Sequence, residues 1–370
     1  MSDLRTWIKQ IEDVGELKKV ENAHWDLEIG CLTALNARQE KPPALLFDNI
    51  VDYPQGYRVL TGALLTPGRV ALALGLPYVE TTRELLGPLK SRLLECETNL
   101  HKFAPRIVSR GTVTENIQKG DDVDLLKFPS PRWAELDGGR YIGTGCSLIT
   151  RDPDSGEINL GCYRVMLHNK NTTALYISVG KHGRMHYDKY HSRGQRAPVA
   201  VSIGQHPIYL VISGVEVPHE PLSEYYFAGA MTGAPVDVIE DDETGLPIPA
   251  DADIVMTGWS PPGKKMTEGP FGEFLGYYGS KDRPEPVIEI KRVYYRNNPI
   301  ILGAPPNRPP SDCAYFIGAL RSAMMYNWLT KSGIPDIREV WMNEIGQQQF
   351  IIISLKQRYA GHAKQAAMLA

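Results

Sequence analysis

The chain has 370 residues, of which 42% are hydrophobic and 22% charged, so its length and composition favour two or three globular domains. A formal net charge of −3 gives no reason to expect nucleic-acid binding, which a basic stripe would suggest. The five cysteines include no C-x-x-C pair, which argues against a zinc or redox motif and for reduced thiols. The polar N-terminus is unlike a secretory leader, and no apolar run approaches the roughly 18 residues of a membrane span. We therefore expect a soluble, cytoplasmic protein.

Residues 1–105 are predicted to form an N-terminal α/β domain. Apolar residues at helical spacing predict a helix over residues 3–13, with Ser2 as its N-cap. A second helix is predicted over residues 82–95, and Pro88 should kink or split it. The strands expected in this part of the chain are residues 16–20, 44–47 and 57–60.

Residues 106–302 are predicted to form a central β domain. Short β-type runs alternate there with turns rich in Gly, Pro, Asn and Asp, which favours a barrel or a sandwich over a βαβ sheet. One helix is expected to interrupt the strands, at residues 223–232. The clearest predicted strands are residues 147–150, 159–167, 197–203, 208–212 and 287–295.

Residues 303–370 are predicted to begin a C-terminal α/β domain. Ser311 is a suitable cap for a long helix that Gly333 closes. Residues 361–370 begin another helix, and this helix ends on apolar residues without a C-cap. We therefore expect the native chain to continue beyond Ala370. The strands expected between the two helices are residues 339–342 and 349–355.

The first candidate functional cluster is residues 159–164, which read Asn-Leu-Gly-Cys-Tyr-Arg. On a strand, Cys162 and Arg164 would share one face and Tyr163 would take the other. Arg164 has two interpretations. It is either an ordinary exposed residue of a sheet, or an arginine held in a pocket to bind a carboxylate or phosphate with its planar fork.

The second cluster is residues 180–186, which read Gly-Lys-His-Gly-Arg-Met-His. His182 and His186 would share one face of a helix and suit a metal, but the two glycines favour a loop. Such a loop is either a polar surface segment or a phosphate-binding glycine loop. Glu224 begins the helix predicted at residues 223–232, where an acid is by itself no more than a partner of the helix dipole.

The third and strongest cluster is residues 268–279, where Glu268 and Glu273 are set among glycine, proline and aromatic residues. This composition predicts neither a helix nor a regular strand, so we expect a loop held in one shape at an entropic cost. Aromatic neighbours would partly desolvate the carboxylates and favour their protonated form, as general acid–base chemistry requires. The alternative is a tight loop whose acids face solvent.

Taken together, these segments resemble the UbiD family of reversible, non-oxidative decarboxylases. The resemblance runs from the N-terminal helix through residues 42–50 to residues 361–365, and it depends on the joint order and spacing of the motifs. It implies an α+β fold whose central domain is a split β-barrel that binds flavin. It also implies prenylated FMN as cofactor, Mn²⁺ (or Mg²⁺) with a nearby K⁺, and an aromatic, heteroaromatic or α,β-unsaturated carboxylate as substrate.

The resemblance assigns roles to individual residues. Arg164 would orient the substrate or tune a glutamate, Glu268 would pair with Arg164, and Glu273 would protonate the carbon that loses CO₂. Residues 305–310, with the start of the helix that follows, would contact the substrate. The metal ligands would be Asn159, His182 and Glu224. The residues implied to contact the cofactor are Asn159, Cys162, Tyr163, Arg164, Lys181, His182 and Glu224.

The resemblance implies further that a flavin prenyltransferase supplies the cofactor and that the protein forms a homodimer or homohexamer. A region beyond the present end would add a cofactor-binding lysine and much of the oligomer interface. Two other functions stay open. An FMN oxidoreductase on a split-barrel domain would show nicotinamide-dependent bleaching of its flavin. A non-catalytic subunit of a carboxylase complex would have no need of the acids at Glu268 and Glu273.

Overall fold

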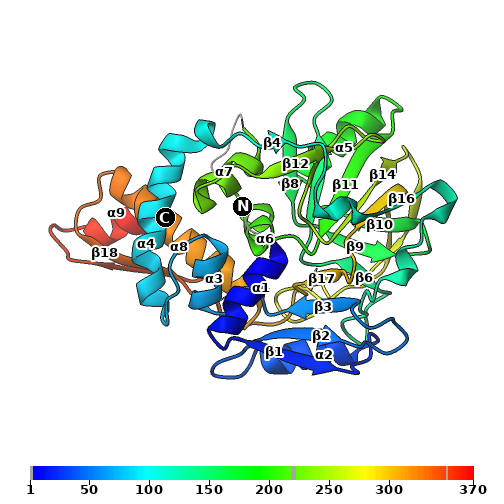
Figure 1. The fold of residues 1–370 in the computed structure, drawn as a ribbon. Helices are drawn as coiled ribbons and strands as arrows, with labels where there is room; N and C mark the ends of the chain where they lie inside the picture. Colours follow the sequence, from blue (N-terminus) through cyan, green and yellow to red (C-terminus); the bar gives the residue numbers. More distant parts are fainter. Residues whose placement is uncertain (1–2, 218–221, 347–348) are drawn as a thin grey trace.

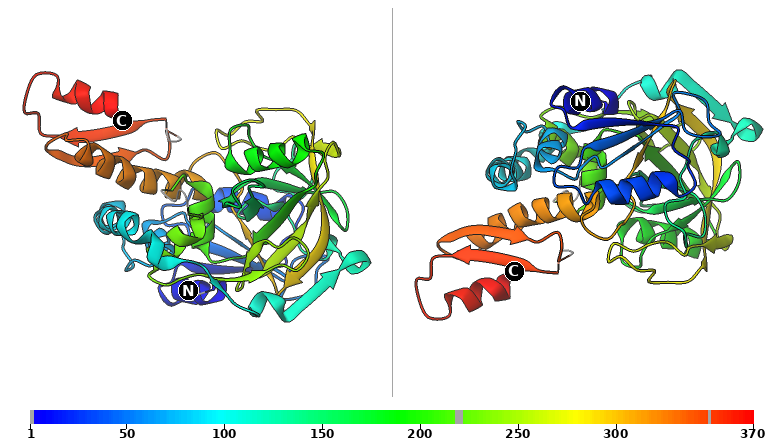
Figure 2. Two further views of the ribbon diagram at one scale, coloured as in Figure 1. Left: turned by 90° about the horizontal axis from the view of Figure 1, so that it is seen from above. Right: turned by 90° about the horizontal axis from the view of Figure 1, so that it is seen from below.

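The computed structural model describes residues 3–217, 222–346 and 349–370. It has a mixed α+β fold with a small N-terminal sheet, a large curled sheet and a C-terminal segment that projects from the body (Figures 1 and 2). The helices in the described residues are α1 (Leu4–Asp13), α2 (Glu28–Asn36), α3 (Pro67–Ala73), α4 (Thr82–Asn99), α5 (His182–Ser192), α6 (Pro207–Gly214), α7 (Glu224–Thr232), α8 (Asp312–Lys331) and α9 (His362–Leu369).

The N-terminal sheet has the strand order β1-β2-β3-β17. Its strands are β1 (Leu17–Glu21), β2 (Ala44–Asp48), β3 (Arg58–Thr61) and β17 (Ile300–Gly303). β17 is distant in sequence from the other three and runs parallel to β3, with Ile300 opposite Arg58. The end of the segment predicted as the central domain therefore completes the sheet of the N-terminal part.

The start of α1 differs from the prediction. Asp3 is its N-cap, and its carboxylate accepts a hydrogen bond from the backbone N–H of Thr6 at 2.8 Å. The predicted cap, Ser2, lies outside the described residues. The predicted split of the second helix is wrong: α4 continues through Pro88, which lies in its second turn. Burial of a leucine stripe on α4 outweighs the backbone hydrogen bond that the proline removes.

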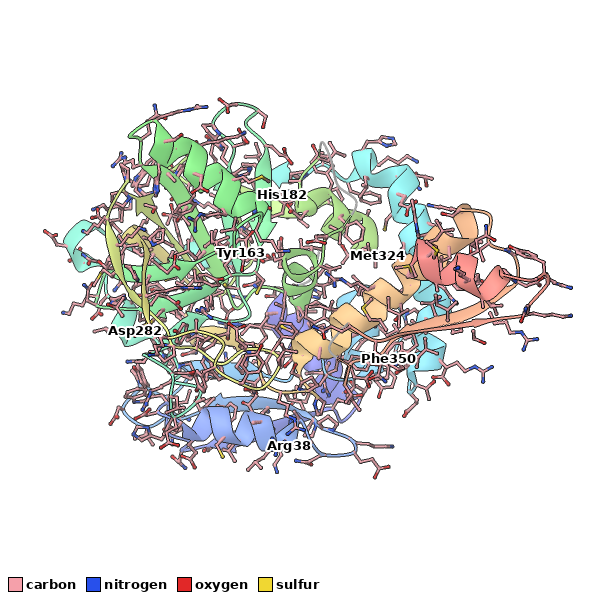
Figure 3. The ribbon with its side chains drawn as sticks, turned by 180° about the vertical axis from the view of Figure 1, so that it is seen from behind. Arg38, Tyr163, His182, Asp282, Met324 and Phe350 are labelled. Carbon is pink, nitrogen blue, oxygen red and sulfur yellow. The ribbon has the colours of Figure 1, made fainter. Side chains whose placement is uncertain are left out.

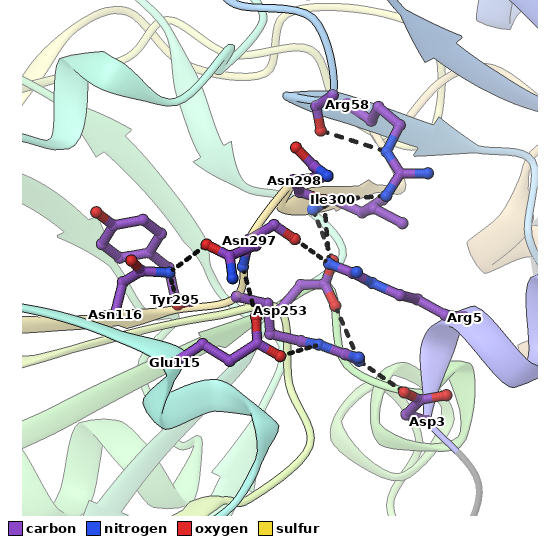
Figure 4. A network of polar contacts seen from close by, with 12 residues as sticks. Asp3, Arg5, Arg58, Glu115, Asn116, Asp253, Tyr295, Asn297, Asn298 and Ile300 are labelled. Carbon is purple, nitrogen blue, oxygen red and sulfur yellow. Dashed lines mark hydrogen bonds and ion pairs between the residues drawn. The ribbon is translucent and has the colours of Figure 1, made fainter.

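A buried carboxylate connects α1 to the N-terminal sheet and to the large curled sheet (Figure 4). Asp253 is fully buried and accepts hydrogen bonds from Arg5 Nη2 at 3.2 Å and from the backbone N–H of Ile300 at 2.8 Å. Arg296 Nη1 lies 3.6 Å from Asp253 and forms a 2.6 Å ion pair with Asp3. Because each buried charge has an oppositely charged partner, this network joins α1 to the end of the central sheet.

The large sheet has ten strands, in the order β6-β9-β10-β16-β14-β11-β7-β8, with β5 and β15 also paired to β16. β8 and β9 lie near opposite ends of this order, yet only Cys162 and Tyr163 separate them in sequence. Two residues span no more than about 11 Å from Gly161 to Arg164, so the sheet curls into a half-barrel until these ends approach. Its strands are β5 (Asn116–Lys119), β6 (Tyr141–Gly143), β7 (Ser147–Arg151), β8 (Ile158–Gly161), β9 (Arg164–Leu167), β10 (Thr172–Tyr176), β11 (Ala197–Ile203), β14 (Ile254–Ser260), β15 (Lys265–Glu268) and β16 (Arg283–Tyr295).

The run at residues 208–212 was predicted as a strand, and this prediction is wrong because the run belongs to α6. Its β-branched residues suit a strand, but Pro207 occupies the first helical turn and His206 acts as N-cap. The fully apolar helix is buried beside the central sheet. Local capping and complete burial therefore decide the conformation of this segment.

His206 predicts a pH dependence of stability. Its Nδ1 accepts from the backbone N–H of Ile208 at 3.2 Å, and burial lowers its pKa to about 3 from the ordinary 6.5. As the pH falls below 6.5 the unfolded chain takes up this proton first, so we expect a loss of about 2 kcal/mol between pH 6.5 and pH 5.

His206→Asn keeps an acceptor for the helix and removes the titration. We expect its free energy of unfolding, measured in urea, to fall less than that of the wild type over this interval. Equal losses in the two proteins would contradict the assignment.

The C-terminal segment consists of α8, a two-stranded sheet and α9. As predicted, Ser311 caps α8, and its hydroxyl accepts from the backbone N–H of Ala314 at 3.3 Å. A small third sheet has the strand order β13-β12-β4. Among the described residues, no helix combines the length and apolar character needed to cross a bilayer. The strands are β4 (Arg106–Ile107), β12 (Asp237–Glu240), β13 (Pro247–Pro249), β18 (Ile337–Met342) and β19 (Ile351–Leu355).

Candidate active site

Two cavities share a wall formed by Cys162 and Tyr163. The larger has a volume of about 690 Å³ and the smaller about 340 Å³. Figure 3 labels Tyr163 and His182, both of which line the larger cavity. The other predicted residues in its lining are Asn159, Lys181 and Glu224. The predicted residues in the lining of the smaller cavity, besides the shared pair, are Arg164, Glu273 and Pro306, and the start of α8 adds Cys313, Ala314 and Ile317.

The shared wall exists because the predicted strand at residues 159–167 is interrupted. β8 ends at Gly161 and β9 begins at Arg164, so Cys162 and Tyr163 pass between the two ends of the curled sheet. The backbone N–H of Cys162 donates to Ser213 O on α6 at 2.8 Å, which fixes this crossing. A Cβ on Gly161 would lie 2.3 Å from the end of the Tyr163 ring, so a larger residue there would require this ring to move.

The two side chains of the wall are electrically neutral. A hydrogen bond with Cys146 and burial raise the pKa of the Cys162 thiol well above its ordinary value. Burial raises the pKa of Tyr163 to about 12. Cys162 is therefore a thiol rather than a nucleophilic thiolate, and Tyr163 keeps its proton.

The loop predicted at residues 180–186 is in fact the start of a helix, because α5 begins at His182 with Lys181 as its N-cap. The larger cavity thus receives the N-terminus of α5, whose unpaired N–H groups and dipole favour an anion. Lys181 Nζ lies beside this end and forms a 2.7 Å ion pair with Glu216. His186 is buried one turn later, with its Nδ1 2.9 Å from Thr150 Oγ1 and its Nε2 3.7 Å from Asp152 Oδ2.

The three predicted metal ligands all line the larger cavity. Glu224 is buried, and its Oε2 accepts from the backbone N–H of Leu160 at 2.9 Å, which joins the start of α7 to β8. Asn159 is also buried, with its Nδ2 3.5 Å from Thr150 Oγ1. An amide oxygen, an imidazole nitrogen and a carboxylate suit Mn²⁺ or Mg²⁺. Within residues 3–217, 222–346 and 349–370, no group of three His, Cys, Asp or Glu side chains has metal-binding geometry, so the metal stays a prediction.

The structure brings the three predicted catalytic side chains together. Arg164 binds Glu268 by two parallel hydrogen bonds of 2.8 Å, from Nε to Oε1 and from Nη2 to Oε2. Its Nη1 is 3.5 Å from Glu273 Oε1. Burial lowers the pKa of Arg164, but the hydrogen bonds and charge of Glu268 outweigh it and raise the pKa above its ordinary value. The guanidinium therefore stays charged between two acids.

The two glutamates have different surroundings. Glu268, at the end of β15, has no exposed surface. The side chain of Glu273, in the loop that follows, is 34% exposed and faces the smaller cavity. Phe271 is buried, as an aromatic neighbour that desolvates the site should be, but Phe274 and Tyr277 are exposed. One acid is thus sealed against Arg164, and the other is accessible from the cavity.

Sequence reasoning missed Tyr141. Its hydroxyl donates to Glu268 Oε1 at 3.0 Å, and its ring lies 3.9 Å from that of Phe271. Burial and the charge of Glu268 raise the pKa of Tyr141, so it remains a donor. Nothing near Tyr141 in the sequence marks it, because β6 is three residues long and more than a hundred residues from Glu268.

Asp137 and Gly138 brace the loop that carries the acids. Asp137 Oδ1 accepts from the backbone N–H of Gly272 at 3.4 Å and from the hydroxyl of Tyr278 at 3.1 Å. Gly138 donates its N–H to Pro270 O at 2.8 Å. A Cβ on Gly138 would lie 2.0 Å from the carbonyl oxygen of Gly269, so the loop packs directly on this backbone.

Gly138→Ala should therefore displace the loop and lower kcat/KM by about 100-fold, the usual cost of a misplacement near 1 Å. Steady-state kinetics measure the effect. The control is Gly87→Ala in α4, where an added Cβ has no neighbour within 4 Å, so unchanged activity is expected. Wild-type kinetics in the Gly138 variant would show that the loop does not depend on this contact.

The comparisons with known proteins agree with this geometry. Three family models match consecutive parts of the chain, and their descriptions are the N-terminal domain, the Rift-related domain and the C-terminal domain of 3-octaprenyl-4-hydroxybenzoate carboxy-lyase. They cover residues 8–87, 106–309 and 314–370 respectively. A curled sheet that carries an arginine between two acids thus occurs in a chain that a carboxy-lyase family matches along most of its length.

Individual relatives extend the match. A pyrrole-2-carboxylic acid decarboxylase from Pseudomonas aeruginosa is 30% identical over 100% of this chain and 74% of its own length. A phenolic acid decarboxylase from Streptomyces is 31% identical over 100% of this chain and 77% of its own. The UbiD-class enzyme HmfF from Pelotomaculum thermopropionicum, solved in an evolved dimeric form in complex with prFMN, superposes with a TM-score of 0.87 at 28% identity, covering 100% of this chain and 82% of that one. The chain belongs to the UbiD family and is a carboxy-lyase of that family.

Proposed function

We propose that the protein catalyses the reversible, non-oxidative decarboxylation of an aromatic, heteroaromatic or α,β-unsaturated carboxylic acid with prenylated FMN. The observation that carries this proposal is the position of Arg164. Its guanidinium is fixed by the fork to Glu268, reaches Glu273 and lines the smaller cavity. This cavity adjoins the larger one at Cys162 and Tyr163, so a substrate in one would lie next to a cofactor in the other.

The reaction converts a carboxylate and a proton into CO₂ and a C–H bond. When bound, prenylated FMN would supply the electron sink that loss of CO₂ from an sp² carbon requires. Arg164 attracts the substrate carboxylate into the smaller cavity and orients it. Glu273, which is accessible from that cavity, donates the proton to the carbon after CO₂ leaves. Buried Glu268 balances the positive charge of Arg164 and holds the orientation of its guanidinium. In the carboxylation direction Glu273 removes the proton.

The larger cavity supports the binding of the cofactor. Its lining combines the N-terminus of α5 with Lys181, which suits the phosphate, and the neutral wall of Cys162 and Tyr163, which suits the ring. Mn²⁺ (or Mg²⁺) would be held by Asn159, His182 and Glu224 at the phosphate, and K⁺ belongs to the same proposal. A flavin prenyltransferase would supply the cofactor, and a homodimer or homohexamer would be the working assembly.

Co-expression with a flavin prenyltransferase tests the proposal. Native mass spectrometry of the purified protein should show prenylated FMN, Mn²⁺ and the oligomer together. The holoenzyme should release CO₂ from an acid in a panel that includes pyrrole-2-carboxylate and 4-hydroxybenzoate, and it should exchange the corresponding C–H hydrogen for deuterium. Unmodified FMN that nicotinamide bleaches would instead show an oxidoreductase. A protein with no cofactor and no turnover would contradict the proposed reaction.

A further inference from the structure

Tyr176, at the end of β10, contacts Arg164 through its ring and has no role in the reaction proposed above. The guanidinium carbon of Arg164 lies 4.4 Å from the ring centroid. Tyr176 and Arg164 are direct cross-strand partners in the pairing of β10 with β9. A cation over an aromatic face is attracted by the ring quadrupole, and more strongly where water is excluded. The contact therefore restrains Arg164 at the point where it lines the smaller cavity.

A second arginine uses the same ring. Arg283, at the start of β16, has its guanidinium carbon 3.9 Å from the Tyr176 centroid and forms a 2.8 Å ion pair with Glu285. β10 lies between β9 and β16 in the sheet, so the two guanidiniums reach the ring from the strands on either side. One aromatic ring thus attracts two guanidiniums from neighbouring strands.

The hydroxyl group of Tyr176 has its own partner. It accepts a hydrogen bond from Ser178 Oγ at 3.2 Å. This hydrogen bond, and then the charges of Arg283 and Arg164, lower the pKa of Tyr176 against the effect of burial. The tyrosine is thus half-buried at the edge of the smaller cavity, with its ring on the arginines and its hydroxyl on Ser178.

We infer that Tyr176 is a positioning residue that holds the Arg164 guanidinium in the orientation in which it receives the substrate carboxylate, with Arg283 as the charge beyond the ring. This inference rests on the proposed function, because it assumes that Arg164 binds the carboxylate. Glu268 fixes one edge of the guanidinium through its fork, and the Tyr176 ring fixes its plane. A fork alone lets the guanidinium tilt about the axis of its two hydrogen bonds. The Tyr176 ring limits this tilt, and the Phe271 ring, whose centroid lies 5.6 Å from the guanidinium carbon, is the more distant aromatic neighbour.

The test compares Tyr176→Leu with Tyr176→Phe in the holoenzyme. The leucine variant loses the aromatic face, so we expect KM for the carboxylate substrate to rise by about tenfold, as loss of one cation–π contact implies. The phenylalanine variant keeps the face and should restore KM to within about threefold of the wild type. The dissociation constant for benzoate, measured by isothermal titration calorimetry, should change in the same order. Should the leucine variant not fold, Tyr176→Met gives the same comparison with a longer and more adaptable apolar side chain.

A matched tyrosine provides the control. Tyr326 on α8 stacks with Lys90 at 3.9 Å and lines neither cavity. Tyr326→Leu should lower the melting temperature without changing KM or benzoate affinity. Two results in an active enzyme would contradict the positioning role. One is a Tyr176→Leu variant whose KM and benzoate affinity are unchanged, as expected for Tyr326→Leu. The other is a Tyr176→Phe variant whose KM rises as much as that of Tyr176→Leu. An inactive wild type, together with unchanged benzoate affinity in every variant, would overturn both the proposed function and this inference. If the wild type is inactive but benzoate affinity falls more in Tyr176→Leu than in Tyr176→Phe, the positioning role alone is supported.

Discussion

Replacing Glu273 by glutamine should reduce CO₂ release and substrate H/D exchange by about 10²–10⁴-fold, the usual contribution of a general acid–base group. Glutamine has nearly the same shape but cannot transfer a carboxylic proton. The contact between Glu273 Oε1 and Arg164 is long, at 3.5 Å, and the side chain is 34% exposed, so the fold should tolerate the change. The absorbance of the bound cofactor should remain that of the wild type.

Glu289→Gln is the matched control for this substitution. Glu289 is on β16, outside both cavities, and pairs with Lys264 at 2.6 Å. It undergoes the same chemical change without access to substrate, so its turnover and exchange should be unaffected. Full activity in Glu273→Gln would show that another group donates the proton.

Glu268→Leu is expected to have the larger effect on stability. It leaves Arg164, whose side chain is only 10% exposed, without its buried counter-charge. Removing one partner of a buried ion pair costs about 3–5 kcal/mol, and the Tyr141 hydroxyl loses its acceptor as well. The free energy of unfolding, measured in urea, should fall by about this amount, and decarboxylation should be lost.

The double variant Arg164→Met/Glu268→Leu separates stability from catalysis. Replacing a whole buried pair by apolar side chains of similar volume is often neutral. Most of the lost stability should therefore return, but activity should not, because the cavity no longer has an arginine. A double variant as unstable as Glu268→Leu would show that the destabilisation comes from packing rather than from an unpaired charge. A fully active Glu268→Leu variant would remove Glu268 from the proposed network.

Local signals in the sequence were sufficient for many elements and for the types of residue at the site. Ser311 caps α8 as predicted, the strand at residues 197–203 forms with the predicted bounds, and the strand at residues 147–150 extends to Arg151. These predictions succeeded because a helix cap and a short apolar run bounded by turn residues are signals that act within a few residues. The prediction at residues 208–212 failed because a fully buried helix and a buried strand have the same apolar composition.

At the site, the sequence alone determined which residue types were present and in which order. Asn159, Arg164, His182 and Glu224, followed by the glycine-rich segment with Glu268 and Glu273, were sufficient to suggest a UbiD-type carboxy-lyase, which the family match confirms. The individual roles of these residues stay predictions.

The tertiary structure alone decided how these residues are arranged. The curl of the sheet brings β8 close to β9, so that Cys162 and Tyr163 lie between two cavities. In the folded chain Glu268 is buried, whereas Glu273 is accessible from the smaller cavity. It also adds Tyr141 and Tyr176, which no motif marks. The contact between Arg164 and Glu268 spans 104 positions of the chain. Contacts at such separations follow from sheet order and curl, and no local pattern of residues encodes them.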